Sequence, residues 1–384
     1  MRIGIDCRMF QKSFTGIGRY TYELVNTLQS LSKTDQQAQA HEFVLFLNDP
    51  EYSDFTPPSS NFKKVLASAP HYSLDEQTRF LKILNAEKLD LMHFTHFNAP
   101  IRYKKPFVVT IHDLTHTLFP GRKMRGLPYR LAYKAVIKNA VKKAKRVIAI
   151  SKNTKNDLIE ILRVPSYKID VIYEAAGSEF RQVRPEDLGT TAKIIKEKYN
   201  IGPPFLLYTG VHRYHKNLPR LIEAFAKLAQ KHQVLKLVMT GKPDPLYPEA
   251  QQKVEELGLS QSVVFPGLVS EEELIALYNL ATAYVFPSLY EGFGLPVLEA
   301  MQCGTPVIAS NTSSIPEIAG KSKDGTPNAI LFNPEEPEDM AEKIDQVLTD
   351  PNLQIKLIEK GLSRAKDFSW EKMTKEILAL YNQQ

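Results

Sequence analysis

The stretch formed by residues 283–309 constrains the fold of this chain more than any other part of the sequence. It opens with an apolar run, 283–287, that is typical of a short buried strand. A turn with two glycines, 291–294, follows, and glycine makes such turns at little steric cost. Pro296 and Gly304 then stand where the first turn and the C-terminal end of a helix favour them. A second apolar run completes a unit of strand, glycine turn, helix and strand.

Such a unit is a natural anion site. The free backbone N–H groups of the turn and the positive end of the helix dipole point to the same place. Two carboxylates, Glu291 and Glu299, flank it. Because a carboxylate would repel a phosphate, we expect both to accept hydrogen bonds from hydroxyl groups. Phosphate and hydroxyls together predict a sugar nucleotide. The structural alternative is an ordinary Rossmann unit with two solvent-facing glutamates.

The length and composition of the chain predict two domains of a globular protein. Its 384 residues are many for a single core, and 43% are hydrophobic and 24% charged. The stretch 174–204 is polar and rich in glycine and proline, which is typical of a boundary. We therefore expect an N-terminal domain over 1–185, a C-terminal domain over 186–366 and a terminal helix over 367–384.

The sequence gives no sign of export or of a membrane span. It contains no run of eighteen apolar residues, and its start lacks the basic and apolar regions of a signal peptide. Cys7 and Cys303 are too few for a disulfide framework and fit a reducing compartment. We therefore expect a cytoplasmic protein.

Apolar runs alternate with helical patterns along the whole chain. The predicted strands are 3–5, 42–47, 62–66, 89–93, 107–111, 147–150 and 169–173, then 205–209, 234–239, 263–265, 283–287, 306–309 and 330–332. The predicted helices include 19–31, 74–84, 218–228 and 340–348. This alternation predicts α/β architecture with doubly wound parallel sheets. Ligands of such sheets bind beyond the carboxyl ends of the strands.

Several residues of the first half lie at this expected edge. Gly16 and Gly18 follow the first strand and precede a helix, so their backbone N–H groups are candidate anion donors. The alternative is a loop that simply needs glycine torsions. His112 follows another strand, where it either contacts a ligand or merely caps the strand end. His93 and His96 could form a metal pair, but no carboxylate or cysteine has ligand-like spacing, so we expect no metal.

Two loops of the second half also suit a nucleotide. Arg213 and Lys216 stand between a strand and a helix, where basic side chains favour a diphosphate. Leu268 and Val269 stand before a helix whose start has the capping-box pattern of Ser270 and Glu273.

The turn EGFG, the two glutamates with seven residues between them and the following CGTPVIAS segment resemble the Glu-x7-Glu motif of retaining glycosyltransferases of family 4. The resemblance is strong from Gly210 onward and weaker before it. It implies the GT-B fold, in which two Rossmann-like domains face each other across a cleft. The N-terminal domain would bind the acceptor, the C-terminal domain would bind the nucleotide sugar, and the terminal helix would cross back to the first domain.

The resemblance also implies roles for individual residues. Glu291 would hold hydroxyls of the transferred sugar, Glu299 would hold the ribose, and Lys216 would hold the diphosphate. Arg213 would act from a shifted position, because Val211 stands where many family members carry arginine. The remaining implied site residues are His112 at the transferred sugar, and Gly16, Gly18, Leu268, Val269, Gly292, Phe293, Gly294 and Leu295 at the donor.

The implied reaction is the transfer of a hexose from a nucleotide diphosphate sugar to a saccharide or lipid-linked saccharide, with retention and without metal or cofactor. TGIGRY with the late EGFGLPVLEAM most resembles bacterial mannosyltransferases of polysaccharide assembly, so GDP-mannose is the expected donor and a UDP-sugar the second choice. Three alternatives stay open. They are a glycosidase using Glu291 and Glu299, another GT-B activity such as an epimerase or phosphorylase, and a non-catalytic sugar-nucleotide-binding subunit.

A basic segment of the first half predicts a further contact. Between Arg122 and Arg146 there are ten Lys or Arg and no Asp or Glu, and a helix is expected over 127–146. Its cationic stripe comprises Arg130, Lys134, Lys138, Lys142 and Lys145. The positions expected to pack inward are Leu127, Leu131, Ala135 and Val136. The stripe predicts peripheral contact with an anionic inner membrane face or a lipid-diphosphate acceptor, and the alternative is a solvated helix face. Nucleic acid is not expected, because aromatic residues are not interleaved with the charges.

Overall fold

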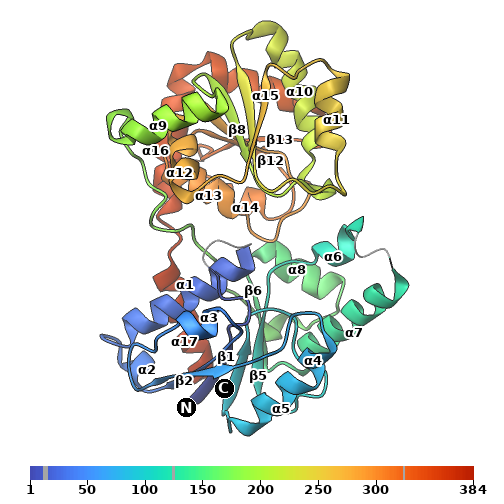
Figure 1. The fold of residues 1–384 in the computed structure, drawn as a ribbon, viewed down its shortest axis with the longest axis vertical. Helices are drawn as coiled ribbons and strands as arrows, with labels where there is room; N and C mark the ends of the chain where they lie inside the picture. The colour runs from blue at the N-terminus through green and yellow to red at the C-terminus, as the bar shows by residue number, and fades with distance from the viewer. Residues whose placement is uncertain (12–15, 123–125, 323–324) are drawn as a thin grey trace. The chain divides into compact units, whose positions relative to one another are not determined.

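The computed structural model describes residues 1–11, 16–122, 126–322 and 325–384 of the chain (Figure 1). These residues form two compact units. Unit 1 comprises Met1–Leu114, Lys123–Glu174 and Ser369–Gln384, and unit 2 comprises Thr115–Arg122 and Ala175–Phe368. The domains expected from the sequence, 1–185, 186–366 and 367–384, stay a prediction.

Unit 1 is built on a seven-stranded parallel sheet in the order β3-β2-β1-β4-β5-β6-β7. Its strands are β1 (Arg2–Asp6), β2 (Glu42–Leu47), β3 (Phe62–Leu66), β4 (Leu91–Phe94), β5 (Phe107–Ile111), β6 (Arg146–Ala149) and β7 (Ile169–Val171). The order reverses at β1 and β4, as in a doubly wound sheet. Because helices cover both faces, the central strands β4 and β5 are buried along their whole length. The parallel sheet predicted for this half is confirmed.

The helices of unit 1 are α1 (Gly16–Leu31), α2 (Gln36–Gln39), α3 (Glu51–Asp54), α4 (Leu74–Gln77), α5 (Arg79–Ala86), α7 (Leu127–Lys143), α8 (Lys152–Glu160) and α17 (Trp370–Asn382), with a 3-10 turn η2 (Ser166–Lys168). The C-terminal α17 packs against α1 and α2. A chain of buried hydrogen bonds connects α17 to the sheet. Tyr381 Oη lies 2.6 Å from His93 Nδ1, and His93 Nε2 lies 2.9 Å from Thr110 Oγ1, which in turn contacts Tyr20 Oη.

Unit 2 is built on a six-stranded parallel sheet in the order β10-β9-β8-β11-β12-β13. The strands are β8 (Phe205–Thr209), β9 (Lys236–Thr240), β10 (Val263–Gly267), β11 (Ala283–Phe286), β12 (Val307–Ser310) and β13 (Ile330–Phe332). The helices are α6 (Thr115–Leu118), α9 (Pro185–Tyr199), α10 (Leu218–Lys231), α11 (Glu249–Glu256), α12 (Glu271–Leu280), α13 (Leu295–Gln302), α14 (Ile315–Ala319), α15 (Pro337–Thr349) and α16 (Pro351–Ala365), with the 3-10 turn η3 (Tyr214–Lys216). The predicted doubly wound sheet is again confirmed.

Two predicted elements differ from the structure. The stretch 174–204, expected to be irregular, contains α9. Acidic residues in its first turn and lysines in its last turn complement the helix dipole, a local signal that outweighs the polar composition. The helix expected over 74–84 is two helices, α4 and α5, because the backbone at Thr78 leaves helical torsions (φ −121°, ψ −71°).

Helix α7 buries a different face from the one expected. Its buried positions are Tyr133, Ile137, Ala140 and Val141. Leu127 is 66% exposed and Leu131 58% exposed, Ala135 is exposed and Val136 is only half-buried. The inward packing predicted for Leu127, Leu131 and Ala135 is therefore wrong, whereas Val136 does pack against the core of unit 1. At 3.6 residues per turn, Leu127 and Leu131 share the outer face with Lys134 and Lys138 rather than opposing it. The helix also ends before Arg146, which begins β6.

Candidate functional site

The glycine turn before α13 has the geometry of an anion site. Gly294 occupies the left-handed region (φ +114°) at the N-cap of α13, and no side chain caps the helix. A Cβ at this position would lie 2.8 Å from Ile315 Cδ1, so a larger residue would also displace that side chain. Gly304 (φ +73°) follows the C-terminal end of the helix, as expected. The first turn of α13 can therefore present its backbone N–H groups to an anion.

Two serines after β12 hold this turn in place. Glu291 N donates to Ser313 Oγ (2.8 Å), and Ser313 Oγ donates to Glu291 O (2.6 Å). Ser314 Oγ donates to Phe293 O at 2.7 Å. The sequence analysis missed both serines. Their position could have indicated this role. They lie in the loop after β12, at the carboxyl edge of the sheet, and the turn after the neighbouring β11 lies at the same edge.

Glu291 and Lys216, predicted separately, are brought together. Lys216 Nζ lies 2.5 Å from Glu291 Oε1, and the two side chains are only 17% and 15% exposed. Lys216 belongs to η3, and Leu289 N donates to the carbonyl of His215 in that turn at 2.8 Å. The loop after β8 is thus fastened to the loop after β11. A lysine and a carboxylate thus lie in the turns next to the uncapped helix start.

Glu299 ends a chain of hydroxyl groups. Tyr278 Oη donates to Glu299 Oε2 (2.9 Å), and Thr209 Oγ1 lies 3.0 Å from Tyr278 Oη and 3.1 Å from Tyr284 Oη. Burial raises the pKa of Tyr278 well above its usual value, so this hydroxyl keeps its proton. Because the Tyr278 hydroxyl donates its hydrogen bond to Glu299, it must accept one from Thr209. The Thr209 hydroxyl must in turn accept a hydrogen bond from Tyr284. The chain fixes the position of the Glu299 carboxylate.

The other predicted residues of unit 2 lie at the same edge with different surroundings. Arg213 is exposed, and its guanidinium has no ion-pair partner among the described residues. Leu268 is 71% exposed in the loop after β10, and Val269 is half-buried beside it. Phe293 is buried against Phe368, with ring centroids 5.8 Å apart. Gly292, Gly294 and Leu295 lie within the turn and the helix start.

In unit 1, both ring nitrogens of His112 face acceptors. Nδ1 lies 3.0 Å from Glu174 Oε1, and Nε2 lies 2.9 Å from Thr95 O. Burial alone would lower the pKa of His112, but the hydrogen bond and charge of Glu174 raise it above its usual value. The protonated form of the ring is therefore favoured, and both of its nitrogens are engaged by acceptors. It is poorly suited to serve as a base.

Gly16 and Gly18 do not form the loop that the sequence suggested. They are helical residues in the first turn of α1, so glycine torsions are not their role. The preceding Thr15 lies outside the described residues. Their proposed contact with the donor stays a prediction.

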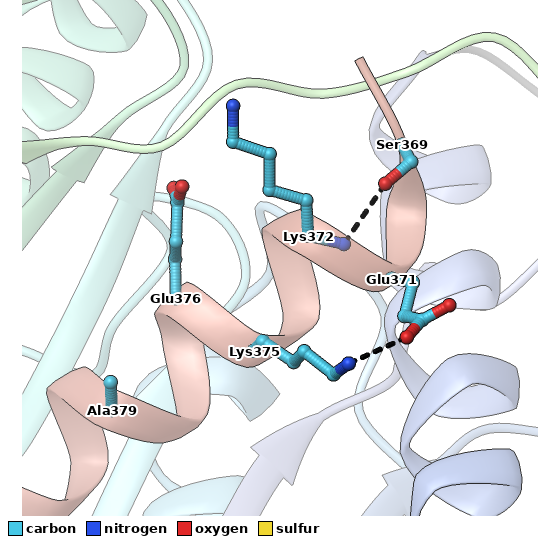
Figure 2. Close-up of a pocket in the computed structure, with 6 residues that line it drawn as sticks. All are labelled: Ser369, Glu371, Lys372, Lys375, Glu376 and Ala379. Atoms are coloured by element: carbon cyan, nitrogen blue, oxygen red, sulfur yellow. Dashed lines mark hydrogen bonds and ion pairs between the residues drawn. The ribbon is translucent and has the colours of Figure 1, made fainter. Parts of the chain in front are cut away.

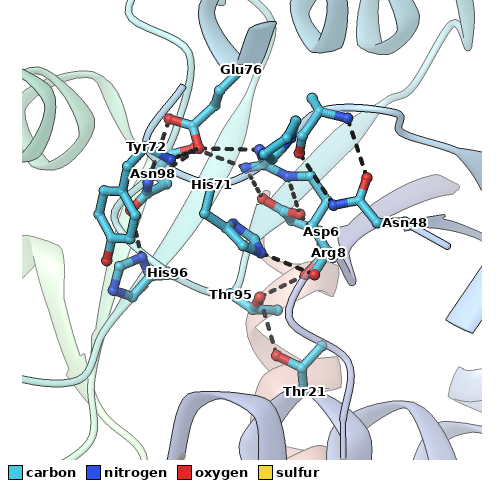
Figure 3. A network of polar contacts seen from close by, with 12 residues as sticks. Asp6, Arg8, Thr21, Asn48, His71, Tyr72, Glu76, Thr95, His96 and Asn98 are labelled. Atoms are coloured by element: carbon cyan, nitrogen blue, oxygen red, sulfur yellow. Dashed lines mark hydrogen bonds and ion pairs between the residues drawn. The ribbon is translucent and has the colours of Figure 1, made fainter. Parts of the chain in front are cut away.

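A buried ionic network organises the carboxyl edge of the unit 1 sheet (Figure 3). The Arg8 guanidinium donates to Asp6 Oδ2 (2.8 Å) and to Glu76 Oε2 (3.1 Å), and all three residues are buried. Asn98 Nδ2 donates to Glu76 at 3.1 Å, and His71 Nε2 contacts the Arg8 carbonyl at 2.9 Å. The network joins the loops after β1, β3 and β4.

Other features of the structure do not form a competing site. Among the described residues, no group of three or more His, Cys, Asp or Glu side chains could hold a metal ion. His93 is engaged by Tyr381 and Thr110, and His96 Nδ1 by Asn98. Figure 2 shows a pocket lined by Ser369, Glu371, Lys372, Lys375, Glu376 and Ala379. All six belong to α17 or its N-cap, so no polar groups from different elements converge there.

The sheets and the site define the class of protein. Two doubly wound parallel sheets, with an uncapped helix start and a carboxylate–lysine pair in the second, are the features of a GT-B protein. The fold is confirmed by HepE of Anabaena, solved in complex with UDP-glucose, which is 17% identical and superimposes with a TM-score of 0.73 over 100% of both chains.

The chain belongs to the glycosyltransferases of group 1 and family 4. The profile described as "Glycosyl transferases group 1" matches residues 191–364, and that of "Glycosyltransferase Family 4" matches residues 14–176. The serotype-specific mannosyltransferase WbdA of Escherichia coli is 32% identical over 266 residues, which are 68% of this chain and 32% of WbdA. The chain thus spans about a third of that relative. The O-antigen chain mannosyltransferase B of Escherichia coli is 27% identical over 99% of both chains.

Proposed function

We propose that this protein transfers a hexose, mannose in first place, from a nucleotide diphosphate sugar to a saccharide or lipid-linked saccharide, with retention of anomeric configuration and without a metal. The observation that carries the proposal is the Lys216–Glu291 pair beside the uncapped start of α13. The names of the two mannosyltransferase relatives support the choice of mannose, and hence of GDP-mannose as donor.

The chemistry follows from the charges of the site. The leaving diphosphate accumulates negative charge, and Lys216 together with the N–H groups of Gly294 and Leu295 would stabilise it. Glu291 would accept hydrogen bonds from the transferred sugar, and Glu299 from the ribose. Such a site accelerates the reaction by positioning and electrostatics, and no residue need form a covalent intermediate.

The site does not suit the glycosidase alternative. A glycosidase needs one carboxylic acid that gives a proton and a second carboxylate opposite it. Here a lysine occupies Glu291, and a tyrosine hydroxyl donates to Glu299. Both carboxylates thus accept hydrogen bonds, as expected of carboxylates that are not proton donors.

The test is turnover. The purified chain is incubated with GDP-mannose, UDP-glucose or UDP-galactose, with α-mannobiose as acceptor and EDTA present. We expect release of GDP and formation of an α-linked trisaccharide. The anomeric configuration is read from the one-bond C1–H1 coupling in the NMR spectrum. A β-linked product would contradict retention, and activity lost in EDTA and restored by Mg²⁺ would contradict metal independence. Nucleotide binding with no transfer to mannobiose, to a polyprenyl diphosphate saccharide or to phosphate would support the non-catalytic alternative.

We also propose that the outer face of α7 contacts an anionic membrane surface. Leu127, Tyr129 and Leu131 are 66%, 68% and 58% exposed, an apolar group at the start of a helix that continues with lysines. The stripe comprises Arg130, Lys134, Lys138 and Lys142, with Lys145 just beyond the helix, and none of these has an acidic partner among the described residues. None of the described helices is long and apolar enough to span a bilayer, so the proposed contact is peripheral.

Vesicle sedimentation tests this contact. We expect binding to vesicles with 30% phosphatidylglycerol and little binding to pure phosphatidylcholine, and the binding should weaken with salt. Leu127→Ser with Leu131→Ser should reduce binding as Lys134→Gln with Lys138→Gln does. If only the lysine variant loses binding, the leucines do not insert. If neither does, α7 is a solvated face.

A further inference from the structure

Buried polar atoms without partners gather at one edge of unit 2. Among its described residues, the buried side-chain atoms that lack a hydrogen bond are Tyr208 Oη, His212 Nδ1 and Nε2, Ser288 Oγ and Ser310 Oγ. Tyr208 is near the end of β8, Ser310 ends β12, and His212 and Ser288 follow β8 and β11. All therefore lie at the carboxyl edge of the sheet, where ligands of such folds bind.

His212 is the most complete case, because both of its ring nitrogens lack a partner. The residue is 2% exposed, and its ring centroid lies 5.8 Å from that of Phe265 and 6.4 Å from that of Tyr208. Its backbone position is fixed by neighbouring loops. His212 N donates a hydrogen bond to Lys242 O (3.4 Å). Two more backbone hydrogen bonds join the ends of the neighbouring strands: Gly210 N donates to Thr240 O, between β8 and β9, and Gly241 N donates to Gly267 O, between β9 and β10.

A packing role does not account for this histidine. Buried polar atoms without hydrogen bonds destabilise a folded protein, and an apolar side chain would fill the same space without that cost. Burial lowers the pKa of His212, so the ring is neutral at pH 7. A neutral imidazole carries one N–H donor and one lone pair, and both await a partner.

We propose that His212 binds the nucleoside part of the donor, with one of its ring nitrogens hydrogen-bonded to the edge of the base. The inference rests on the proposed function and extends it to the recognition of the base. The strand order supports it. The anion site lies after β11, Lys216 follows β8, and His212 and Phe265 lie towards β9 and β10. A nucleotide with its diphosphate at α13 would thus extend across the end of β8 towards His212.

The experiment compares His212→Leu with wild type in two measurements, thermal unfolding without ligand and calorimetric titration with GDP, UDP and ADP. We expect His212→Leu to bind the preferred nucleotide about tenfold more weakly, as the loss of one good hydrogen-bonded contact predicts. Its unfolding temperature should equal or exceed that of wild type, by about 2–4 °C, because the unsatisfied ring is gone. The control is His232→Leu, at a histidine of the same unit that pairs with Asp345 (2.7 Å) at the C-terminal end of α10. It should leave nucleotide affinity unchanged.

The outcomes separate the two proposals. If wild type binds none of the three nucleotides, the proposed function fails, and the inference fails with it. If wild type binds and His212→Leu binds equally well, only the inference is overturned, and His212 is a core residue with a buried water. If His212→Leu does not fold, the ring-nitrogen signals of His212 are followed by NMR of protein labelled with ¹⁵N-histidine. The His212 signals are those that are missing from the spectrum of His212→Gln. Addition of the preferred nucleotide to wild type should then shift a ring-nitrogen signal of His212, and unchanged signals would overturn the proposal.

Discussion

Removing Lys216 should weaken nucleotide binding, whereas neutralising its partner Glu291 should not. The two groups form a close, largely buried pair in the structure, with 2.5 Å between Lys216 Nζ and Glu291 Oε1. A diphosphate offers the lysine more negative charge than one carboxylate does. A hydrogen bond to a charged group contributes about 1.5–3 kcal/mol, so Lys216→Ala should cost about 2 kcal/mol of binding. That is roughly a 30-fold loss of affinity.

The assay is calorimetric titration with GDP and UDP, followed by turnover with the matching sugar nucleotide. Glu291→Gln should keep the nucleotide affinity within about threefold, since it frees the lysine, but it should lose at least about tenfold in kcat because the sugar loses a charged acceptor. The control is Lys227→Ala, which breaks an exposed pair with Glu338 (2.9 Å) on the same unit. Exposed pairs contribute about 0–1 kcal/mol, so nucleotide affinity should not change.

Two results would refute this reasoning. Lys216→Ala with wild-type affinity would mean that the diphosphate does not reach Lys216. Equal losses of affinity in Lys216→Ala and Glu291→Gln would mean that the ion pair holds the loop and does not contact the nucleotide. A thermal unfolding curve for each variant separates these cases from misfolding.

Further predictions concern both units. Arg8→Met leaves Asp6 and Glu76 buried without their cation, so urea unfolding should show a loss of about 3–5 kcal/mol; an unchanged midpoint would contradict the network. Because Glu174 raises the pKa of His112, the stability from this pair is fully present below the unfolded pKa and is lost as pH rises through the folded pKa. The destabilisation by Glu174→Gln should therefore be largest at pH 6 and smaller at pH 9. Tyr278→Phe removes the donor to Glu299 and should raise KM for the sugar nucleotide by about three- to tenfold, the range for one hydrogen bond; an unchanged KM would place the ribose elsewhere.

Most of the architecture could be predicted because it depends on local pattern. Most strands of the two sheets contain an apolar run, and α13 begins after Gly294 and ends before Gly304, as proline and glycine preferences require. For Lys216 and Glu291, the sequence predicted only that both lie at the same edge of the sheet and did not predict that they form a pair. Their contact depends on the register between β8 and β11 and on the turn η3, and neither is written in local composition.

The residues that the sequence analysis missed are those whose chemistry is ordinary. Ser313, Ser314, Thr209 and Tyr278 are common polar residues, and only their position at the carboxyl ends of strands or against Glu299 gives them a role. The partners of His112 could not be predicted either. Its ring nitrogens are engaged by Glu174 and Thr95, which are both remote in the sequence, and its contact with the transferred sugar stays a prediction.

The buried face of α7 differs from the predicted one, and this changes how the helix can bind a membrane. If Leu127 and Leu131 packed inward, the outer face would carry charge alone, and its attraction to a membrane would be purely electrostatic and screened by salt. With both leucines outside, apolar burial adds to the attraction of Lys134 and Lys138. Binding should then retain a component at high salt that the leucine variant lacks. A residual affinity at 0.5 M salt, present in wild type and absent in Leu127→Ser with Leu131→Ser, would show that the exposed leucines enter the bilayer surface.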